Sequence, residues 1–216
     1  MVATKAKGNR GGCALFGAHA DAPEAAAFAE IVADLMHRYA RDIVAKNQLC
    51  PFLHNVEAGL GAVVVALDRV PDPDATARAI RATERDVVHV VFPLVDRENS
   101  PAFERFGNSV AEKLRKDGGD PLVHAAFHPA MVGGRENAHR LVGLLRRSPD
   151  AFLQFIPPGM QAGGTVMQGE PLPKAPALAD TFTRMVKDGG IEAVIEALDA
   201  LHAERAERCK AFSFGA

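Results

Sequence analysis

Three short stretches of the chain carry residue types that could perform chemistry. Cys50 lies in the segment 49–52 (LCPF), His128 in the segment 127–129 (FHP) and Arg147 in the segment 146–149 (RRSP). A thiolate is a nucleophile, an imidazole transfers protons near neutral pH, and a guanidinium binds carboxylate or phosphate through paired hydrogen bonds. Together they predict a site in which Cys50 and His128 react and Arg147 holds an anion.

His128 has three interpretations. It follows a predicted strand, so it could cap the sheet through backbone hydrogen bonds, or it could act as a general acid or base. It could also bind a metal with His124, because residues four apart on a strand share a face. The Gly133-Gly134 turn after it leads to a helix, whose amides near Gly134 and Arg135 would suit an anion.

Cys50 also has two interpretations. A free cysteine between Leu49 and Phe52 is typical of a small buried hydrophobic residue. The expected helix C-terminus before it would raise the thiol pKa, although Lys46 or a nearby histidine such as His54 could offset this. Cys13 and Cys209 fall in the expected terminal tails and are weaker candidates for a reactive thiol.

The Arg146-Arg147 pair has two interpretations as well. Cations are favoured at the end of a helix, because the helix dipole is negative there. Alternatively the pair forms an anion clamp.

Alternating hydrophobic segments predict the elements that must position these residues. The predicted helices are a long one from about Pro23 to Asn47 with Asp21 near its start, one from Pro73 to Arg85, one opened by Ser100 as N-cap and stopped at Gly118-Gly119, one from Glu136 to Leu145, and one or two at the C-terminus separated by Gly189-Gly190. The predicted strands are 61–67, 87–91, 122–127 and 151–156, and residues 159–176 are expected to form an ordered, irregular loop.

Four strands alternating with helices predict an α/β single domain with a largely parallel or mixed sheet. A split, partly antiparallel α+β sheet is the alternative, since strand order is not readable from the sequence. In a parallel sheet, ligands bind beyond the carboxyl ends of the strands, which favours Asp68, Pro93–Arg97 and His128–Arg135. We expect the domain to span 23–207, with flexible tails at 1–22 and 208–216.

Composition excludes several classes of protein. The 216 residues are 48% hydrophobic and 24% charged, a mix typical of globular proteins. The net charge of −2, the single tyrosine and the lack of tryptophan argue against nucleic-acid binding. No stretch is long and apolar enough to span a membrane. With only 3 cysteines, we expect a reducing, cytoplasmic location.

The three segments together resemble an uncharacterised bacterial and plastid family that is described only as a domain of unknown function. Its pattern has Leu-Cys-Pro-Phe after a first helix, a strand ending in Phe-His-Pro, and Asn-Arg-(Ser/Ala)-Pro before a last strand, and the likeness extends from about Phe28 to Arg205. The resemblance implies a shared pocket that contains Cys50, His128, Arg147 and Pro149. This chain departs from the pattern at Arg146, where the family has Asn, and at Gln154, where the family's last strand has His. If that histidine is a ligand or a base in the family, the chemistry of this chain is changed or lost. The expected substrate contacts are Arg147, Ser148, Gly134, Arg135 and Gln154.

Three functions remain open on these grounds. The leading hypothesis is an enzyme, of the hydrolase, lyase or transferase type, that acts on a small anionic molecule. The second is a metal- or haem-binding protein that uses His128 with His124, His89 or Cys50. The third is a non-catalytic accessory protein or homodimer that uses the apolar face of the long helix containing Phe28 and Val44.

Overall fold

The computed structural model describes residues 14–47, 61–83, 85, 87–116, 122–157, 166–167, 170–171 and 178–212. Within these ranges the helices are α1 (Ala25–Arg38), the π-helix η1 (Tyr39–Ala45), α3 (Pro73–Arg81), α4 (Ser100–Lys116), α5 (Ala138–Leu145), α7 (Leu178–Lys187) and α8 (Gly190–Cys209). The strands are β1 (Ala14–Phe16), β2 (Ala62–Ala66), β3 (Val88–Phe92), β4 (Val123–Phe127), β5 (Ala151–Ile156), β6 (Val166–Met167) and β7 (Glu170–Pro171). The segment with Cys50, residues 48–60, lies outside the described residues.

The main sheet of the described chain has five strands in the order β1-β2-β3-β5-β4. Strands β1, β2 and β3 pair in parallel, while β5 pairs antiparallel with both β3 and β4, so β4 runs in the same direction as β3. The predicted α/β class is confirmed, with a mixed sheet. The prediction that the first 22 residues form a tail was wrong for Ala14–Phe16, because this three-residue strand adds to the edge of the sheet beside β2.

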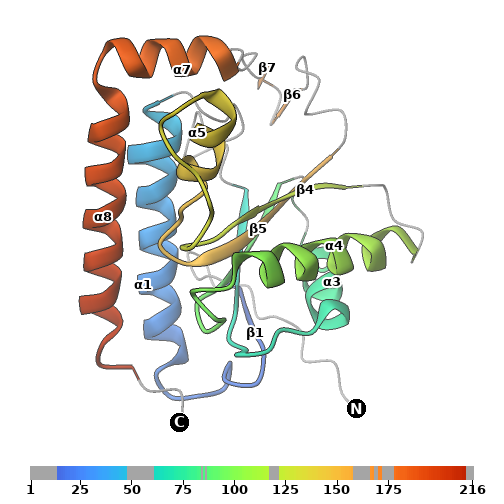
Figure 1. Cartoon of the computed structure of the whole chain (residues 1–216). Coiled ribbons are helices and arrows are strands. Elements are labelled where there is room, and N and C mark those ends of the chain that lie inside the picture. Colours follow the sequence, from blue (N-terminus) through green and yellow to red (C-terminus); the bar gives the residue numbers. More distant parts are fainter. Residues whose placement is uncertain are drawn as a thin grey trace.

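Helices cover both faces of the sheet (Figure 1). Because side chains alternate across a strand, successive residues of one strand enter different cores. Val65, Val91 and Phe152 join the core beneath α1, η1 and α8, whereas their neighbours Val64 and Val90 join the core beneath α3 and α4. The central strands β3 and β5 are therefore buried on both faces, as their almost entirely apolar sequences require.

Local signals explain most helix boundaries. The Asp72 side chain accepts hydrogen bonds from the Asp74 and Ala75 amides and is followed by Pro73, where the sequence predicts the helix to begin. Gly189 adopts φ +66° between α7 and α8, which is a conformation that glycine reaches without strain. At α4, however, the amide of Ala102 donates to the side chain of Asn99, so Asn99 rather than Ser100 performs the predicted capping.

The first helix differs from its prediction in two ways. It begins at Ala25 after Glu24, which provides no side-chain cap, and Asp21 lies a full turn before this start. At Tyr39 the backbone changes from α- to π-helix and continues to Ala45. The π-helix therefore begins at Tyr39, whose side chain is completely buried.

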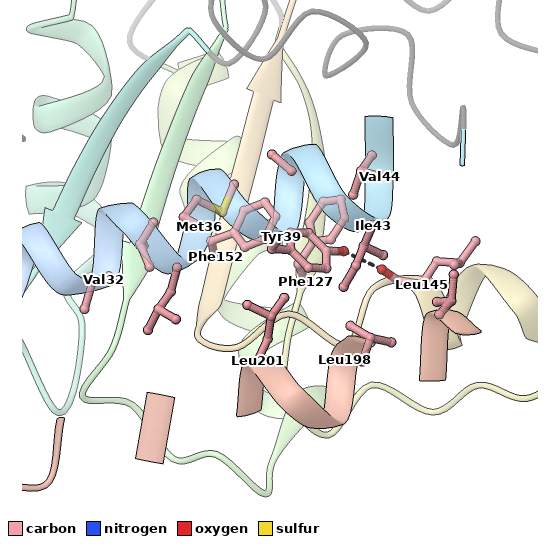
Figure 2. Packing of buried hydrophobic residues seen from close by; sticks show 14 of the residues in the cluster. Val32, Met36, Tyr39, Ile43, Val44, Phe127, Leu145, Phe152, Leu198 and Leu201 are labelled. Atoms are coloured by element: carbon pink, nitrogen blue, oxygen red, sulfur yellow. Dashed lines mark hydrogen bonds between the residues drawn. The ribbon is translucent and has the colours of Figure 1, made fainter. Parts of the chain in front are cut away.

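A cluster of aromatic rings joins η1 to the sheet and to the loop that precedes β5 (Figure 2). The Phe127 and Phe152 rings stack with their centroids 4.2 Å apart, and Tyr39 meets both edge-on. The Tyr39 hydroxyl donates a hydrogen bond to the backbone carbonyl of Leu145 at the end of α5. This contact fixes the start of the segment that carries Arg146 and Arg147.

Candidate functional site

A pocket of about 290 Å³ lies beyond the carboxyl ends of β3 and β4, on the side where α8 packs. Its volume is close to the lower end of the range for small-molecule sites. The lining side chains come from the loops after β3 and β4, from the end of α5 and the turn after it, and from one face of α8. They are Arg97, Glu98, Pro129, Ala130, Leu144, Arg147, Ile195, Leu198, Asp199 and His202. We call this the α8 pocket.

Arg147 lines the α8 pocket, as the anion-clamp hypothesis requires. Its Nε donates to the carbonyl of Met131 at 3.0 Å, and its Nη2 donates to the carbonyl of Gly133 at 3.1 Å. These bonds hold the guanidinium against the loop after β4. Among the described residues its Nη1 makes no hydrogen bond, so one donor nitrogen remains for a ligand.

Arg97 is the second guanidinium in the lining, and a buried carboxylate holds it. Its Nη1 donates to Asp150 Oδ1 at 3.1 Å and to the carbonyl of Pro149 at 2.8 Å. Arg205 Nε also donates to Asp150 Oδ1, at 2.9 Å. Burial raises the pKa of the Asp150 carboxyl, and the two guanidinium groups oppose that rise. In the described chain, Asp150 Oδ2 is buried with no hydrogen-bond partner.

His202 is the imidazole of this pocket. Its Nδ1 lies 3.5 Å from Arg97 Nη2, and its Nε2 lies 3.4 Å from the backbone carbonyl of Arg147. Burial lowers the pKa of His202, and Arg97 lowers it further, while Asp150 and the bond to the Arg147 carbonyl act in the opposite direction. The ring is therefore neutral at pH 7 and can accept a proton.

His128 occupies a different environment beside the pocket. The ring is fully buried, its Nε2 donates to the carbonyl of Asp96 at 2.9 Å, and its Nδ1 accepts from the amide of Ala130 at 3.1 Å. Burial lowers the pKa of this imidazole too. Both ring nitrogens are thus bonded to backbone, so His128 ties the loop after β3 to the loop after β4.

This geometry matches the sheet-capping interpretation of His128 and gives no support to its role as a catalytic base or metal ligand. His124 does lie on the same face of the sheet, where its ring stacks on Phe155 at 5.8 Å. Within the described ranges no group of three or more His, Cys, Asp or Glu side chains could hold a metal ion. The pairing of Cys50 with His128 stays a prediction, because Cys50 lies outside those ranges.

The structure does not bring the other expected substrate contacts into the α8 pocket. The Gly134 amide donates to the carbonyl of Arg140, and Arg135 forms an exposed ion pair with Glu192. The helix after this loop begins at Ala138, not at Glu136, and Asn137 caps it. An anion therefore finds no unpaired Gly134 amide.

Ser148 and Gln154 are buried in structural roles. The Ser148 hydroxyl donates to the carbonyl of Asp150 at 2.6 Å, which shapes the turn before β5. Gln154 lies opposite His89 in the sheet, and its Nε2 is 2.9 Å from His89 Nε2.

Sequence reasoning missed Arg97, Asp150, His202 and Arg205 as parts of one cluster. The rule about strand ends had favoured the segment that contains Arg97. His202 follows Leu198 by four residues on an otherwise apolar helix face, which is a signal that could have identified it. Cys209, expected in a tail, lies buried at the end of α8 near this cluster, and burial raises its thiol pKa.

These features define an α/β protein with a small pocket that mixes guanidinium, imidazole and carboxylate groups at the carboxyl edge of its sheet. Comparisons with protein-family models, with curated proteins and with solved structures gave no match. The resemblance to a family of unknown function stays a prediction. In the described part of the chain no helix is both long and apolar enough to cross a bilayer.

Proposed function

We propose that the protein is a cytoplasmic enzyme that binds a small anionic substrate in the α8 pocket. The observation that carries this proposal is the approach of two guanidinium groups, Arg97 and Arg147, and one neutral imidazole, His202, around one cavity. Guanidinium groups match the geometry of carboxylate and phosphate, and the partly enclosed pocket weakens the screening of their charge by water.

In this proposal each group has a separate role. Arg147 offers its Nη1 to the anion, and Arg97 adds a second positive charge, positioned by Asp150. His202 accepts or donates a proton at the substrate, because its two contacts within the protein, 3.5 Å to Arg97 and 3.4 Å to the Arg147 carbonyl, are long enough for the substrate to replace one of them. His128 is a positioning residue that connects the two loops carrying Arg97 and Ala130.

The burial of the first helix favours this function over that of an accessory protein. The apolar side chains that could have formed a dimer surface, including Phe28, Val32, Met36 and Val44, are all 3% exposed or less. The large hydrophobic residues that are exposed in the described chain, Val70, Val132 and Val186, lie on separate elements. They do not form the continuous patch that an obligate partner surface requires.

The proposal is tested by the binding of acetate, 4-methylpentanoate and inorganic phosphate, measured by calorimetry at pH 7. We expect at least one of these anions to bind. Arg147→Lys and Arg97→Lys should each weaken its binding by about tenfold, because a lysine has a single ammonium group and cannot keep the bonds that hold the guanidinium in the wall while also donating to the anion. Arg140→Gln removes an exposed guanidinium outside the pocket and is the matched control. Failure of all three anions to bind, or binding indifferent to both pocket arginines, would contradict the proposal.

A further inference from the structure

Two acidic side chains line the α8 pocket without an ion pair to any residue that the structure describes. Glu98 follows Arg97 in the loop after β3, and Asp199 lies on α8 between Leu198 and His202. Within the described residues, neither carboxylate makes an ion pair or a side-chain hydrogen bond. The carboxylate that holds Arg97 is that of Asp150, which does not line the pocket.

The charges of the lining therefore balance. The lining contains two guanidinium groups and two carboxylates, and His202 is neutral. A purely anionic molecule would gain from Arg97 and Arg147 but would be repelled by Glu98 and Asp199. A molecule that also carries an ammonium group would interact favourably with both sets of charges.

The remaining lining is apolar. Leu144, Ile195, Leu198, Pro129 and Ala130 provide it, and the cavity of about 290 Å³ leaves room for only a short carbon skeleton beside the charged groups. This wall favours an aliphatic part in the ligand, because apolar surface gains free energy on leaving water.

We infer that the ligand of the α8 pocket is a small zwitterion of the aliphatic amino-acid type. This inference rests on the proposed function and makes its substrate class more specific. The carboxylate of the ligand binds Arg147 and Arg97, its ammonium group binds Asp199 and Glu98, and its aliphatic part contacts Leu198 and its neighbours.

Matched sets of molecules test the inference. Alanine, valine and leucine are compared by calorimetry at pH 7 with the acids that lack the amino group, namely propanoate, 3-methylbutanoate and 4-methylpentanoate, and leucine is also compared with 3-methylbutylamine. We expect at least one amino acid to bind about tenfold more tightly than its deaminated acid, because the acid loses the attraction of two exposed carboxylates. Leucine should likewise bind about tenfold more tightly than the amine, which has no carboxylate for the two guanidinium groups.

Two variants locate the ammonium group. Asp199→Asn and Glu98→Gln should each weaken the binding of the amino acid by about fivefold, because each removes a partner of the ammonium group. The deaminated acid should bind as before or more tightly, because a repulsive charge has been removed. Glu196→Gln removes an exposed carboxylate from the same helix outside the pocket, and it should change neither affinity.

A second cavity of about 250 Å³ provides a further control. It lies on the other side of the loop after β3 and is lined by Val70, Val95, Phe103, Phe106 and their neighbours. Val70 is 88% exposed, so Val70→Ser alters this cavity with little effect on folding. We expect this variant to leave the affinity of the amino acid unchanged.

The outcomes separate the inference from the proposed function. The inference of a zwitterionic ligand would be wrong if each amino acid bound no more tightly than its deaminated acid. It would also be wrong if Val70→Ser, but not Asp199→Asn, abolished amino-acid binding. If amino acids and deaminated acids bound equally well, the anion proposal would still stand, provided that Arg147→Lys weakened the binding of the acids. If neither the acids nor the amino acids bind, the zwitterion inference is wrong, and if inorganic phosphate also fails to bind, the anion proposal is wrong as well.

Discussion

At the scale of single residues, His128 shows how a reactive residue type can serve the structure. The motif around it suggests acid–base chemistry, yet both ring nitrogens are bonded to backbone groups of two loops. A buried imidazole held in this way requires one uncharged tautomer. Its contribution to stability must therefore depend on pH.

We predict that His128→Ala lowers the free energy of unfolding by about 3 kcal/mol at pH 7.5, through two lost hydrogen bonds and a cavity. Burial lowers the folded-state pKa of His128 below 6.5, so the unfolded chain takes up the proton first as the pH falls. The stability that this residue contributes is thus fully present above about pH 6.5 and is lost as the pH falls toward the folded-state pKa. Urea unfolding between pH 7.5 and 5 should show a smaller loss of stability on acidification in the variant. An unchanged pH dependence would contradict this assignment.

Tyr39→Phe tests the buried hydrogen bond to Leu145. The ring contacts with Phe127 and Phe152 should persist, but the carbonyl of Leu145 loses its side-chain donor in an apolar environment. We expect a loss of about 1 to 2 kcal/mol in the free energy of unfolding, measured by urea denaturation. A variant as stable as the wild type would show that the hydroxyl is not needed there.

At the scale of elements, the close approach of α5 to the loop after β4 positions Arg147. A Cβ atom added at Gly143 would lie 2.0 Å from the carbonyl oxygen of Val132, and one at Gly133 would lie 1.8 Å from the amide nitrogen of Leu144. Both obstacles are backbone atoms, so neither can move without shifting a whole segment. These two glycines allow the helix and the loop to pack backbone against backbone.

Gly143→Ala should therefore destabilise the protein by about 2 to 3 kcal/mol, even though alanine is the better helix former by about 1 kcal/mol. Gly190→Ala in α8 is the matched control, since the nearest atoms to its added Cβ are 3.6 Å away. The Gly190→Ala variant should be as stable as the wild type, or slightly more stable, in thermal and urea unfolding. If both variants behaved alike, the close contact at Gly143 would be disproved.

At the scale of the whole molecule, one sheet separates two hydrophobic cores. Leu198 belongs to the core beneath α1 and α8, and Phe103 belongs to the core beneath α3 and α4. The prediction of a single domain implies that both cores unfold together although their side chains form two separate clusters.

We predict that Leu198→Ala and Phe103→Leu each lower the free energy of unfolding, by about 3 and 1 to 2 kcal/mol, and that the double variant adds them to within about 0.5 kcal/mol. Far-UV circular dichroism and amide hydrogen exchange should report one transition in each variant. Two separate transitions would divide the chain into independently folding parts.

The sequence by itself determined the elements that local physics controls. Apolar runs that are too short for helices indicate buried strands, and the Asp72-Pro73 and Gly189 signals mark helix ends, because these effects act within a few residues. The strand-end rule also predicted the correct edge of the sheet for a pocket, since it depends only on strand direction.

Only the tertiary structure decided which groups share a cavity. Arg97, Arg147 and His202 come from three elements far apart in the chain, and their approach depends on strand order and on the packing of α8. The fold also gives His128, Ser148 and Gln154 hydrogen-bond partners within the protein, away from the pocket lining. Whether a polar side chain reacts or supports the fold depends on its neighbours in space, and a single sequence does not specify those neighbours.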